Sequence, residues 1–203
     1  DNTLLRQRLG DTANDNLGNA VAMADVNNDG TPDIIAAAML DDPLNPSTNL
    51  AMIDAGSVYV WDGASGNLLY QFKGDSAGDK FGFAVAAADV NNDDYADIIA
   101  SAPFDDPLNS ATNVAMTDAG SVYIYSGVDG SLLYKFTGNV GDMAGMALAT
   151  LQHNLDGYAD IAVGMPKDDP FKSGTTTVLT DAGTVTIYSG ADGSSLWQGQ
   201  GTV

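Results

Sequence analysis

The sequence predicts an all-β protein made of tandem four-stranded antiparallel units, and three observations lead to this prediction. First, motifs recur at a nearly fixed spacing, as Asp-Ala-Gly does at 54–56, 118–120 and 181–183. Second, each repeat holds four runs of residues with the length and composition of β-strands. Third, no segment carries a sustained helical periodicity. A repeat of about 64 residues is typical of a solenoid, a propeller or a linear array.

The middle repeat shows the four strands most clearly. Its first two runs, at 83–88 and 97–102, are almost continuously apolar, which predicts strands buried on both faces of a sheet. The third run, at 121–125, is rich in β-branched and aromatic residues. The fourth run, at 132–136, follows an Asp-Gly turn of the kind that closes a β-hairpin.

Such units, repeated in tandem, favour the blades of a β-propeller, and a β-solenoid is the alternative. The repeats cover approximately 11–74, 75–138 and 139–203, which we treat as a single propeller-type domain. Residues 1–10 align with strand four of the later repeats, so the chain opens on strand four of a missing or shared blade. Propellers close with about four to eight blades. Three blades plus one spare strand therefore leave the ring incomplete within this chain. Two alternatives follow: the chain is part of a longer propeller, or it completes a ring or a polymer with other copies.

The composition excludes several classes of partner. Seven basic residues stand against 27 acidic ones, and the net charge is −20. A nucleic acid or an anionic membrane surface needs a basic protein surface, so neither is expected as a partner. No apolar run is long enough to span a membrane as a helix, so no membrane insertion is expected. Cysteine is absent, so no disulfide stabilises the fold.

An acidic loop of nine residues follows the first strand of each repeat. Oxygen-bearing side chains fall at loop positions 1, 3, 5 and 9: Asp25, Asn27, Asp29 and Asp33; Asp89, Asn91, Asp93 and Asp97; Gln152, Asn154, Asp156 and Asp160. Such spacing lets a turn direct its odd positions toward one point, where each pair of like charges at ~4 Å costs roughly 1 to 4 kcal/mol. A hard cation with oxygen ligands removes this cost, and Ca²⁺ suits it best. A metal-free turn held by hydrogen bonds from Asp and Asn side chains is the alternative.

The combination of period, acidic loop and flanking motifs resembles FG-GAP repeats, the units of the seven-bladed propeller of integrin α chains, which also occur in bacterial secreted and surface proteins. The name describes a Phe-Gly early in the repeat and a Gly-Ala-Pro after the loop. The middle repeat has Phe81-Gly82 and Ser101-Ala102-Pro103. The other two depart from it, with Leu17-Gly18 and Ala144-Gly145 at the first motif.

The resemblance implies the ligands of the metal. The side chains at positions 1, 3, 5 and 9 would bind Ca²⁺ together with the backbone carbonyl at position 7, contributed by Thr31, Tyr95 and Tyr158. Position 6 needs a left-handed backbone, which Gly30 adopts freely and Asp94 adopts at some cost. In the third loop Gln152 replaces the first Asp, which removes one charge and should weaken binding. We therefore expect two calcium sites and a degenerate third.

The long connections between strands two and three, at 41–56, 105–120 and 168–183, are the best candidates for binding a ligand, because loops on a rigid scaffold commonly carry function. Strand alternation places them on the face opposite the acidic loops. The alternative is a structural role in turns between the blades. The only histidine, His153, is expected to be a solvated loop residue, and no catalytic set can be argued from spacing.

Together these observations predict a non-catalytic, calcium-stabilised interaction or adhesion module that is secreted or on the cell surface. It would bind a protein or a glycan through the connections opposite the calcium loops. Two alternatives are kept: a subunit that assembles with other copies of itself through exposed blade edges, and the propeller appendage of a secreted enzyme that acts on polysaccharide.

Overall fold

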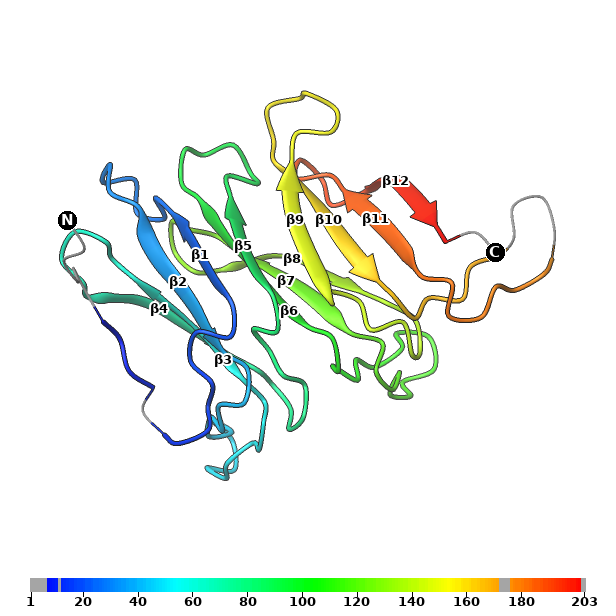
Figure 1. The fold of residues 1–203 in the computed structure, drawn as a ribbon, viewed down its shortest axis with the longest axis horizontal. Helices are drawn as coiled ribbons and strands as arrows, with labels where there is room; N and C mark the ends of the chain where they lie inside the picture. Colours follow the sequence, from blue (N-terminus) through cyan, green and yellow to red (C-terminus); the bar gives the residue numbers. More distant parts are fainter. Residues whose placement is uncertain (1–6, 11, 172–175, 202–203) are drawn as a thin grey trace.

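A computed structural model describes residues 7–10, 12–171 and 176–201, and it shows three four-stranded antiparallel sheets side by side (Figure 1). Within each sheet the strands follow one another in chain order. The described residues contain no helix, and hence none that is long and apolar enough to cross a membrane. The predicted all-β blades are confirmed, and the three sheets do not close a ring.

Each sheet forms one blade. Blade 1 contains β1 (Val21–Ala24), β2 (Asp33–Ala38), β3 (Ser57–Trp61) and β4 (Leu68–Lys73). Blade 2 contains β5 (Val85–Ala88), β6 (Asp97–Ala102), β7 (Ser121–Tyr125) and β8 (Leu132–Thr137). Blade 3 contains β9 (Ala147–Leu151), β10 (Asp160–Met165), β11 (Thr184–Tyr188) and β12 (Ser195–Gln200). The second strands lie in the interior: every residue of β6 is buried, as its apolar sequence predicts.

The prediction for the first strands was wrong in two respects. In the middle repeat strand β5 begins at Val85 rather than at residue 83, because Phe83 lies in the turn before it. Strand β5 is also only half-buried, and β1 exposes Val21 and Met23. The first strands lie along one side of the row of blades, where no further layer of the described chain covers them (Figure 1). The small side chains of these strands reflect close approach between neighbouring strands rather than burial on both faces.

The joint between blades 1 and 2 is built from backbone hydrogen bonds. The segment at 78–82 precedes β5 and lies against the segment at 53–56, which ends the long connection of blade 1. The amides of Gly78, Lys80 and Phe81 donate to the carbonyls of Ile53, Asp54 and Ala55, at 2.9, 3.1 and 2.8 Å. A side chain at Gly56 would collide with the backbone of Phe81, so only glycine allows this approach. We call 78–82, and its counterparts 14–18 and 141–145, the insertion segments.

The joint between blades 2 and 3 repeats this pattern. The amides of Gly141, Met143 and Ala144 donate to the carbonyls of Thr117, Asp118 and Ala119, at 2.9, 3.0 and 3.0 Å. Aromatic side chains add a second contact in both joints. Phe72 stacks on Tyr125 with 4.1 Å between ring centroids, and Phe136 stacks on Tyr188 with 4.0 Å. The joints are therefore specific, repeated interfaces and not merely consequences of chain connectivity.

Residues 7–10 form no regular strand, and the rest of the predicted spare strand, together with the boundary residues 11 and 203, lies outside the described residues. The position of residues 7–10 nevertheless follows the repeat. Arg8, which occupies the repeat position of Phe72, lies over the ring of Trp61 at 5.8 Å. Trp61 in turn occupies the repeat position of Tyr125. This segment thus takes the place of the fourth strand of a preceding blade.

Phe81 is the side chain that tests the joint most directly. It is 1% exposed and makes edge contacts with Tyr123 and Tyr125. Phe81→Ala should lower the free energy of unfolding by about 3–5 kcal/mol, because it removes a buried aromatic ring and leaves a cavity. Phe171→Ala is the matched control, since Phe171 is 62% exposed and the change should cost within about 0.5 kcal/mol. Urea denaturation of both variants provides the measurement, and equal midpoints would contradict the described joint.

Candidate functional site

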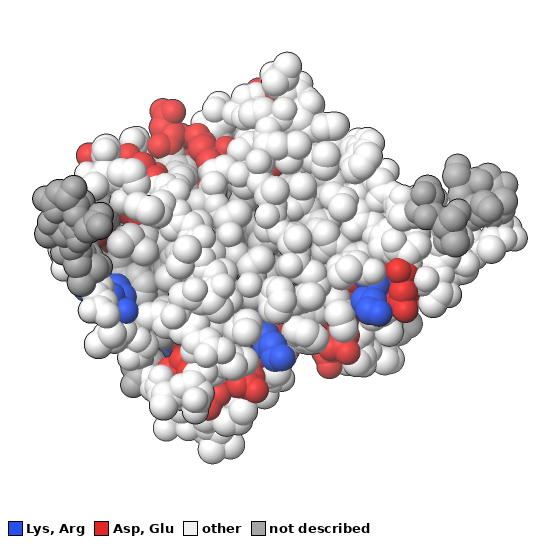
Figure 2. Space-filling model, in the orientation of Figure 1, with Lys and Arg blue, Asp and Glu red and all other residues white. Residues whose placement is uncertain are grey.

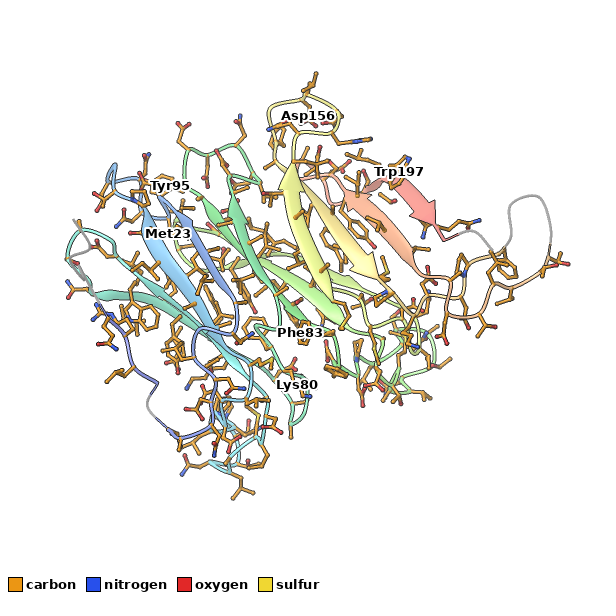
Figure 3. All side chains as sticks on the ribbon, in the orientation of Figure 1. Met23, Lys80, Phe83, Tyr95, Asp156 and Trp197 are labelled. Carbon is orange, nitrogen blue, oxygen red and sulfur yellow. The ribbon has the colours of Figure 1, made fainter. Side chains whose placement is uncertain are left out.

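The acidic loops lie at one edge of the row of blades, each between the first and second strand of its blade. Tyr95 and Asp156 mark two of them at the upper edge of Figure 3. The hairpins between the third and fourth strands lie beside them. Figure 2 shows acidic side chains gathered along the upper and lower edges, with an almost uncharged surface between.

The aspartate at loop position 9 is fully buried in all three blades, and it ties the loop to the neighbouring hairpin. In blade 1, Asp33 accepts hydrogen bonds from the amides of Val26 at 2.9 Å and Gly63 at 2.8 Å. Asp97 and Asp160 repeat this arrangement with the amides of Val90 and Gly127, and of His153 and Gly190. Burial raises the pKa of Asp97 to about 6, while these backbone donors act to lower it. This residue therefore holds the loop in place whether or not a metal is bound.

The other odd positions hold the loop in a tight turn. Asp25 accepts from the amides of Asp29 at 3.0 Å and Gly30 at 2.8 Å, and Asp29 accepts from Thr31 at 2.8 Å. Position 6 has the expected left-handed backbone, with φ of 86° at Gly30 and 70° at Asp94. A carboxylate offers about four acceptor sites, so these bonds leave lone pairs for a cation. The hydrogen-bonded turn and the metal site are therefore compatible.

Asn91, at position 3 of the second loop, provides the observation that tests whether the loop fits a cation. Its amide nitrogen donates to Asp93 at 2.8 Å, but its Oδ1 atom is buried and has no hydrogen-bond partner within the described structure. The corresponding oxygens of Asn27 and Asn154 each accept an amide hydrogen bond. A buried acceptor without a partner costs roughly 1–3 kcal/mol, and a cation would satisfy it. Together with the all-oxygen donor set, this atom shows that the loop fits Ca²⁺.

The third loop differs from the other two in its hydrogen bonds at position 1. Asp25 and Asp89 each accept two amides through the side chain, whereas Gln152 makes no corresponding bond among the described residues. Asp156 and Asp160 keep their backbone bonds. Leu155 lies at position 4 with φ of 58° and is strongly exposed. This loop has lost the residue that fixes its start. His153 is exposed, as expected.

Neighbouring loops are joined directly, which the sequence did not indicate. The amide of Ala96, at position 8 of the second loop, donates to the carbonyl of Asp25 at 3.1 Å. The amide of Ala159 donates to the carbonyl of Asp89 in the same way, also at 3.1 Å. The first residue of each of the first two predicted sites thus contacts the next loop. A metal that orders one loop would also order part of its neighbour.

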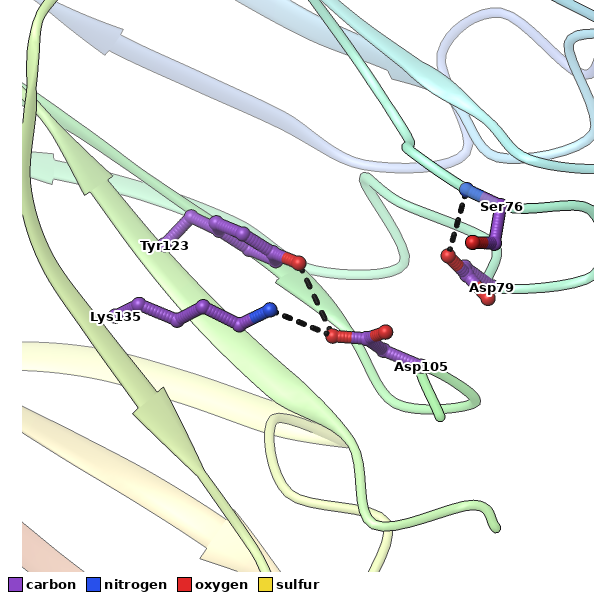
Figure 4. Close-up of polar contacts among 5 residues, drawn as sticks. All are labelled: Ser76, Asp79, Asp105, Tyr123 and Lys135. Atoms are coloured by element: carbon purple, nitrogen blue, oxygen red, sulfur yellow. Dashed lines mark hydrogen bonds and ion pairs between the residues drawn. The ribbon is translucent and has the colours of Figure 1, made fainter. Parts of the chain in front are cut away.

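A second acidic group lies at the opposite edge, in the joint between blades 1 and 2 (Figure 4). Asp75, Asp79 and Asp105 each place a carboxylate oxygen within 4.8 Å of the others, and among the described residues they are the only such group of three. Lys135 contacts Asp105 at 3.1 Å, and the hydroxyl of Tyr123 donates to the same carboxylate at 3.0 Å. Asp75, Asp105 and Lys135 line part of a groove of about 380 Å³. Sequence reasoning missed this acidic group, because Asp105 comes from a different connection than Asp75 and Asp79.

The electrostatics of this group favour a shared proton. Asp79 is 4% exposed, and burial raises its pKa to about 8, assisted by a hydrogen bond with Asp75 and by the charges of Asp105 and Asp75. Burial and the charge of Asp105 also raise the pKa of Tyr123, so its hydroxyl stays protonated as a donor. The geometry would admit a cation, but Lys135 and a proton on Asp79 already offset part of the negative charge.

The long connections form hairpin-like turns and not open loops. In blade 1, Leu44 bridges Ala51, and the side chain of Asp42 accepts the amide of Asp54 at 2.8 Å. Asp41 is buried and accepts from the hydroxyl of Tyr59. The turn residues therefore have the structural role that was one of the two expectations. Each connection also exposes an apolar residue at the same repeat position: Leu44, Leu108 and Phe171.

The buried carboxyl of Asp79 makes stability depend on pH. Its pKa is about 8 in the folded protein and about 3.9 when unfolded, so the folded state binds the extra proton between these values. Its contribution to stability is fully present below about pH 4 and is lost as the pH rises toward 8, with a slope of up to about 1.4 kcal/mol per pH unit. Asp79→Asn should flatten this slope in urea denaturation with chelator present.

Asp192→Asn is the control for that experiment. Hydrogen bonds from Ser194 hold the pKa of the fully exposed Asp192 below its usual range, so this group does not titrate between pH 4 and 8. The control should keep the slope of the parent protein. A slope that Asp79→Asn leaves unchanged would contradict the assignment of a protonated Asp79.

Comparison with known proteins agrees with the geometry of the repeats. The FG-GAP repeat family model matches residues 81–125, from the insertion segment of blade 2 to the end of β7. Integrin alpha-V of Gallus gallus is 28% identical over 170 residues, which are 83% of this chain and 16% of that protein. Integrin alpha-PS3 of Drosophila melanogaster is 34% identical over 143 residues, which are 68% of this chain and 11% of that protein. The chain thus spans less than a fifth of the length of these relatives.

Among solved structures, rhamnogalacturonan lyase YesW has a similar fold, with a TM-score of 0.54 over 91% of this chain and 34% of that protein. The sequence identity is 14%, so this likeness concerns the fold alone. The expected resemblance is therefore confirmed: the chain is an FG-GAP repeat protein that resembles integrin α chains.

Proposed function

We propose that the protein is a non-catalytic interaction or adhesion module, stabilised by Ca²⁺ and working outside the cell. The observation that carries the proposal is the repeated acidic loop with oxygen donors only, in which Asn91 Oδ1 is buried without a partner. The resemblance to integrin α chains supports both the adhesive role and the location. Millimolar extracellular calcium suits sites with dissociation constants of about 10⁻⁴ to 10⁻³ M.

The atoms that we propose to coordinate Ca²⁺ are the same ones that the sequence predicts. Side chains at positions 1, 3, 5 and 9 and the carbonyl at position 7 would hold the ion in loops 25–33 and 89–97, and more weakly in 152–160. When bound, Ca²⁺ supplies positive charge that offsets the repulsion between the loop carboxylates. The position of the loops is fixed by the chain's own residues. Asp33 and Asp97 anchor their loops to the adjacent hairpins, and Ala96 links the second loop to the first.

We place the partner-binding surface on the opposite edge, where the long connections lie. Hydrogen bonds within the turns fix the backbone of these connections. The connections would therefore lose little conformational entropy when a partner binds. Leu44, Leu108 and Phe171 form a repeated apolar row beside the carboxylates of Asp42 and Asp106. A row of this kind suits a protein or glycan with apolar faces and positive or hydroxyl groups.

A second candidate function is that of a propeller appendage of an enzyme acting on polysaccharide. The fold likeness to a rhamnogalacturonan lyase favours it. So does the group of Lys135, Tyr123 and Asp105, because the repeat positions of Lys135 hold Gln71 and Gln198 in the other blades. The joint between blades 1 and 2 therefore has a lysine and a tyrosine beside its carboxylates, and the lysine has no equivalent in the other blades. A functional site on an otherwise repeated scaffold would show such a difference.

Calcium should raise the melting temperature of the protein over that in chelator. Two sites at an ion concentration of about 50 times the dissociation constant add roughly 2 kcal/mol each, which is a shift of roughly 10 °C for a chain of this size. Differential scanning calorimetry measures it. The same shift should not appear with Na⁺ at equal ionic strength, and identical melting curves in calcium and in chelator would exclude structural metal.

A reciprocal exchange at loop position 1 tests which residues bind the ion. Asp25→Gln copies the third loop into the first, and should remove one strong site from a calcium titration. Gln152→Asp makes the opposite change, and should convert the weak third site into a strong one. Isothermal titration calorimetry of both variants counts the sites, and a count that neither variant alters would show that position 1 is not a ligand.

A glycan array followed by an assay for cleavage separates the two functions. The interaction module should bind without releasing products, and Phe171→Asp should reduce binding because it places a charge in the apolar row. Leu155→Asp is the control, since Leu155 is also an exposed apolar residue but lies in an acidic loop at the other edge. Release of unsaturated products from rhamnogalacturonan that disappears in Lys135→Gln would favour the enzyme instead.

A further inference from the structure

We propose that Asp75, Asp79 and Asp105, which we call the carboxylate triad, form a calcium site that fixes the joint between blades 1 and 2. Asp75 and Asp79 lie in the link between β4 and β5, and Asp105 lies in the long connection of blade 2. None of the three belongs to an acidic loop, so this site is independent of the calcium sites proposed for those loops. A cation held by the triad would tie the link between the two blades to the body of blade 2.

The spacing of the triad suits calcium. Each of the three carboxylates places an oxygen within 4.8 Å of the other two. Three points at such separations lie at most about 2.8 Å from a common centre, and calcium binds oxygen at about 2.3–2.6 Å. Magnesium requires about 2.0–2.1 Å and a rigid octahedron. Asp75 is exposed, so a small movement of its side chain would complete a calcium site.

The charge of the triad leaves room for one divalent ion. Lys135 contacts Asp105 at 3.1 Å and is the one basic side chain that the described structure shows in an ion pair with the triad. Lys135 and the hydroxyl of Tyr123 both contact Oδ2 of Asp105, and in Figure 4 the other carboxylate oxygen points away from them. Metal ligands must be deprotonated, so a cation would displace the proton of Asp79. Three carboxylates and one ammonium then carry two negative charges in excess, which one divalent cation would balance.

Ser121 brings a buried hydroxyl to the triad. The residue has no solvent exposure, and its Oγ atom has no hydrogen-bond partner within the described structure. Alternation along β7 places Ser121 on the same face as Tyr123, whose hydroxyl donates to Asp105 at 3.0 Å. A buried hydroxyl without a partner costs roughly 1–3 kcal/mol, and a cation would satisfy its oxygen.

The neighbours of Ser121 across the sheet show where its side chain points. Ala102 of β6 and Thr137 of β8 pair directly with Ser121 and share its face of the sheet. Ala102 lines a small cavity together with Asp75 and Asp79. Thr137 lines the groove together with Asp75 and Asp105. The hydroxyl between these two neighbours is therefore directed into the triad, as an additional oxygen ligand would be.

Blade 3 shows the same position without a complete triad. Thr184 occupies the repeat position of Ser121, and its hydroxyl donates at 2.6 Å to Asp168, which occupies the position of Asp105. The link before blade 3 is one residue shorter and has no counterpart of Asp75. The hydroxyl is thus bonded to its carboxylate where the third acid is missing, and left without a partner where the triad is complete.

Blade 1 has the same residue types in its sequence. Ser57 occupies the position of Ser121, and it is also buried without a partner among the described residues. Asp11, Asp15 and Asp41 occupy the positions of the triad, but Asp11 lies outside the described residues. We therefore assign the site only to the joint between blades 1 and 2, where every member is described.

A manganese titration followed by amide NMR spectra of the full chain tests the site. Mn²⁺ suits the same oxygen ligands, and as a paramagnetic ion it broadens the signals of nearby amides. The signals of Ser76 and Ser121 should broaden in the parent protein, in addition to those of the acidic loops. Asp75→Asn should raise the Mn²⁺ concentration needed at the joint by roughly tenfold or more, because it removes one charged ligand. Calcium should reverse the broadening at a lower concentration than magnesium does.

Asp106→Asn is the matched control. Asp106 is an exposed aspartate that lines the same groove outside the triad, and an asparagine oxygen can still accept the amide of Asp118. The control should leave the titration of the joint unchanged, and loop signals that still broaden show that each variant is folded. Joint signals that stay sharp while loop signals broaden would overturn this site and leave the proposed function standing. Equal titrations of the parent and Asp75→Asn, or magnesium that competes as well as calcium, would also overturn it.

Ser121→Ala separates a ligand from a hydroxyl that is merely buried. In chelator the variant should be at least as stable to urea as the parent, because it removes a polar group without a partner. In the manganese titration it should bind several-fold more weakly at the joint. Binding equal to that of the parent, or a loss of stability in chelator, would contradict the assignment of this hydroxyl to the site.

Discussion

The burial of one carboxylate per blade is the constraint on which the rest of the structure depends. Asp33, Asp97 and Asp160 have no solvent exposure, and each accepts amides from both its own loop and the adjacent hairpin. An ionised group in such a place costs several kcal/mol unless it is fully hydrogen-bonded or paired. No basic side chain is among the partners of these residues in the described structure. Backbone amides, and in our account a divalent cation, supply the compensation. The loop, the hairpin and the first two strands are thereby fixed as one unit.

That unit also determines how blades meet. The amide of Ala96 reaches back to Asp25, so the loops form a connected row along one edge. At the opposite edge the insertion segments of blades 2 and 3 bind the preceding blade by three amides each, and aromatic pairs fill the space between the sheets. Stability in such an array is roughly a sum over blades and nearest-neighbour joints. An ion that orders one loop therefore stabilises its own blade and contributes to the joint beside it.

The fold and the acidic loops could be predicted from the sequence because they repeat. The strands at 97–102 and 121–125 have the predicted bounds, and Gly30 and Asp94 have the left-handed backbone that position 6 requires. The limits of prediction have physical causes. The half-burial of β5 depends on the arrangement of the blades, which local pattern does not encode. The Asp75, Asp79 and Asp105 group comes together from two separate connections. Asn16 and Lys80 adopt a left-handed backbone without the glycine that would have predicted it.

A crystal structure grown in calcium, with anomalous diffraction data, tests the central claim most directly. We expect an anomalous peak inside each of the loops 25–33 and 89–97, with oxygen ligands that include the Oδ1 atom of Asn91 at about 2.3–2.6 Å, and a weaker peak or none in loop 152–160. Well-ordered first and second loops without such peaks would contradict the account, because the buried carboxylates would then be compensated by backbone amides alone.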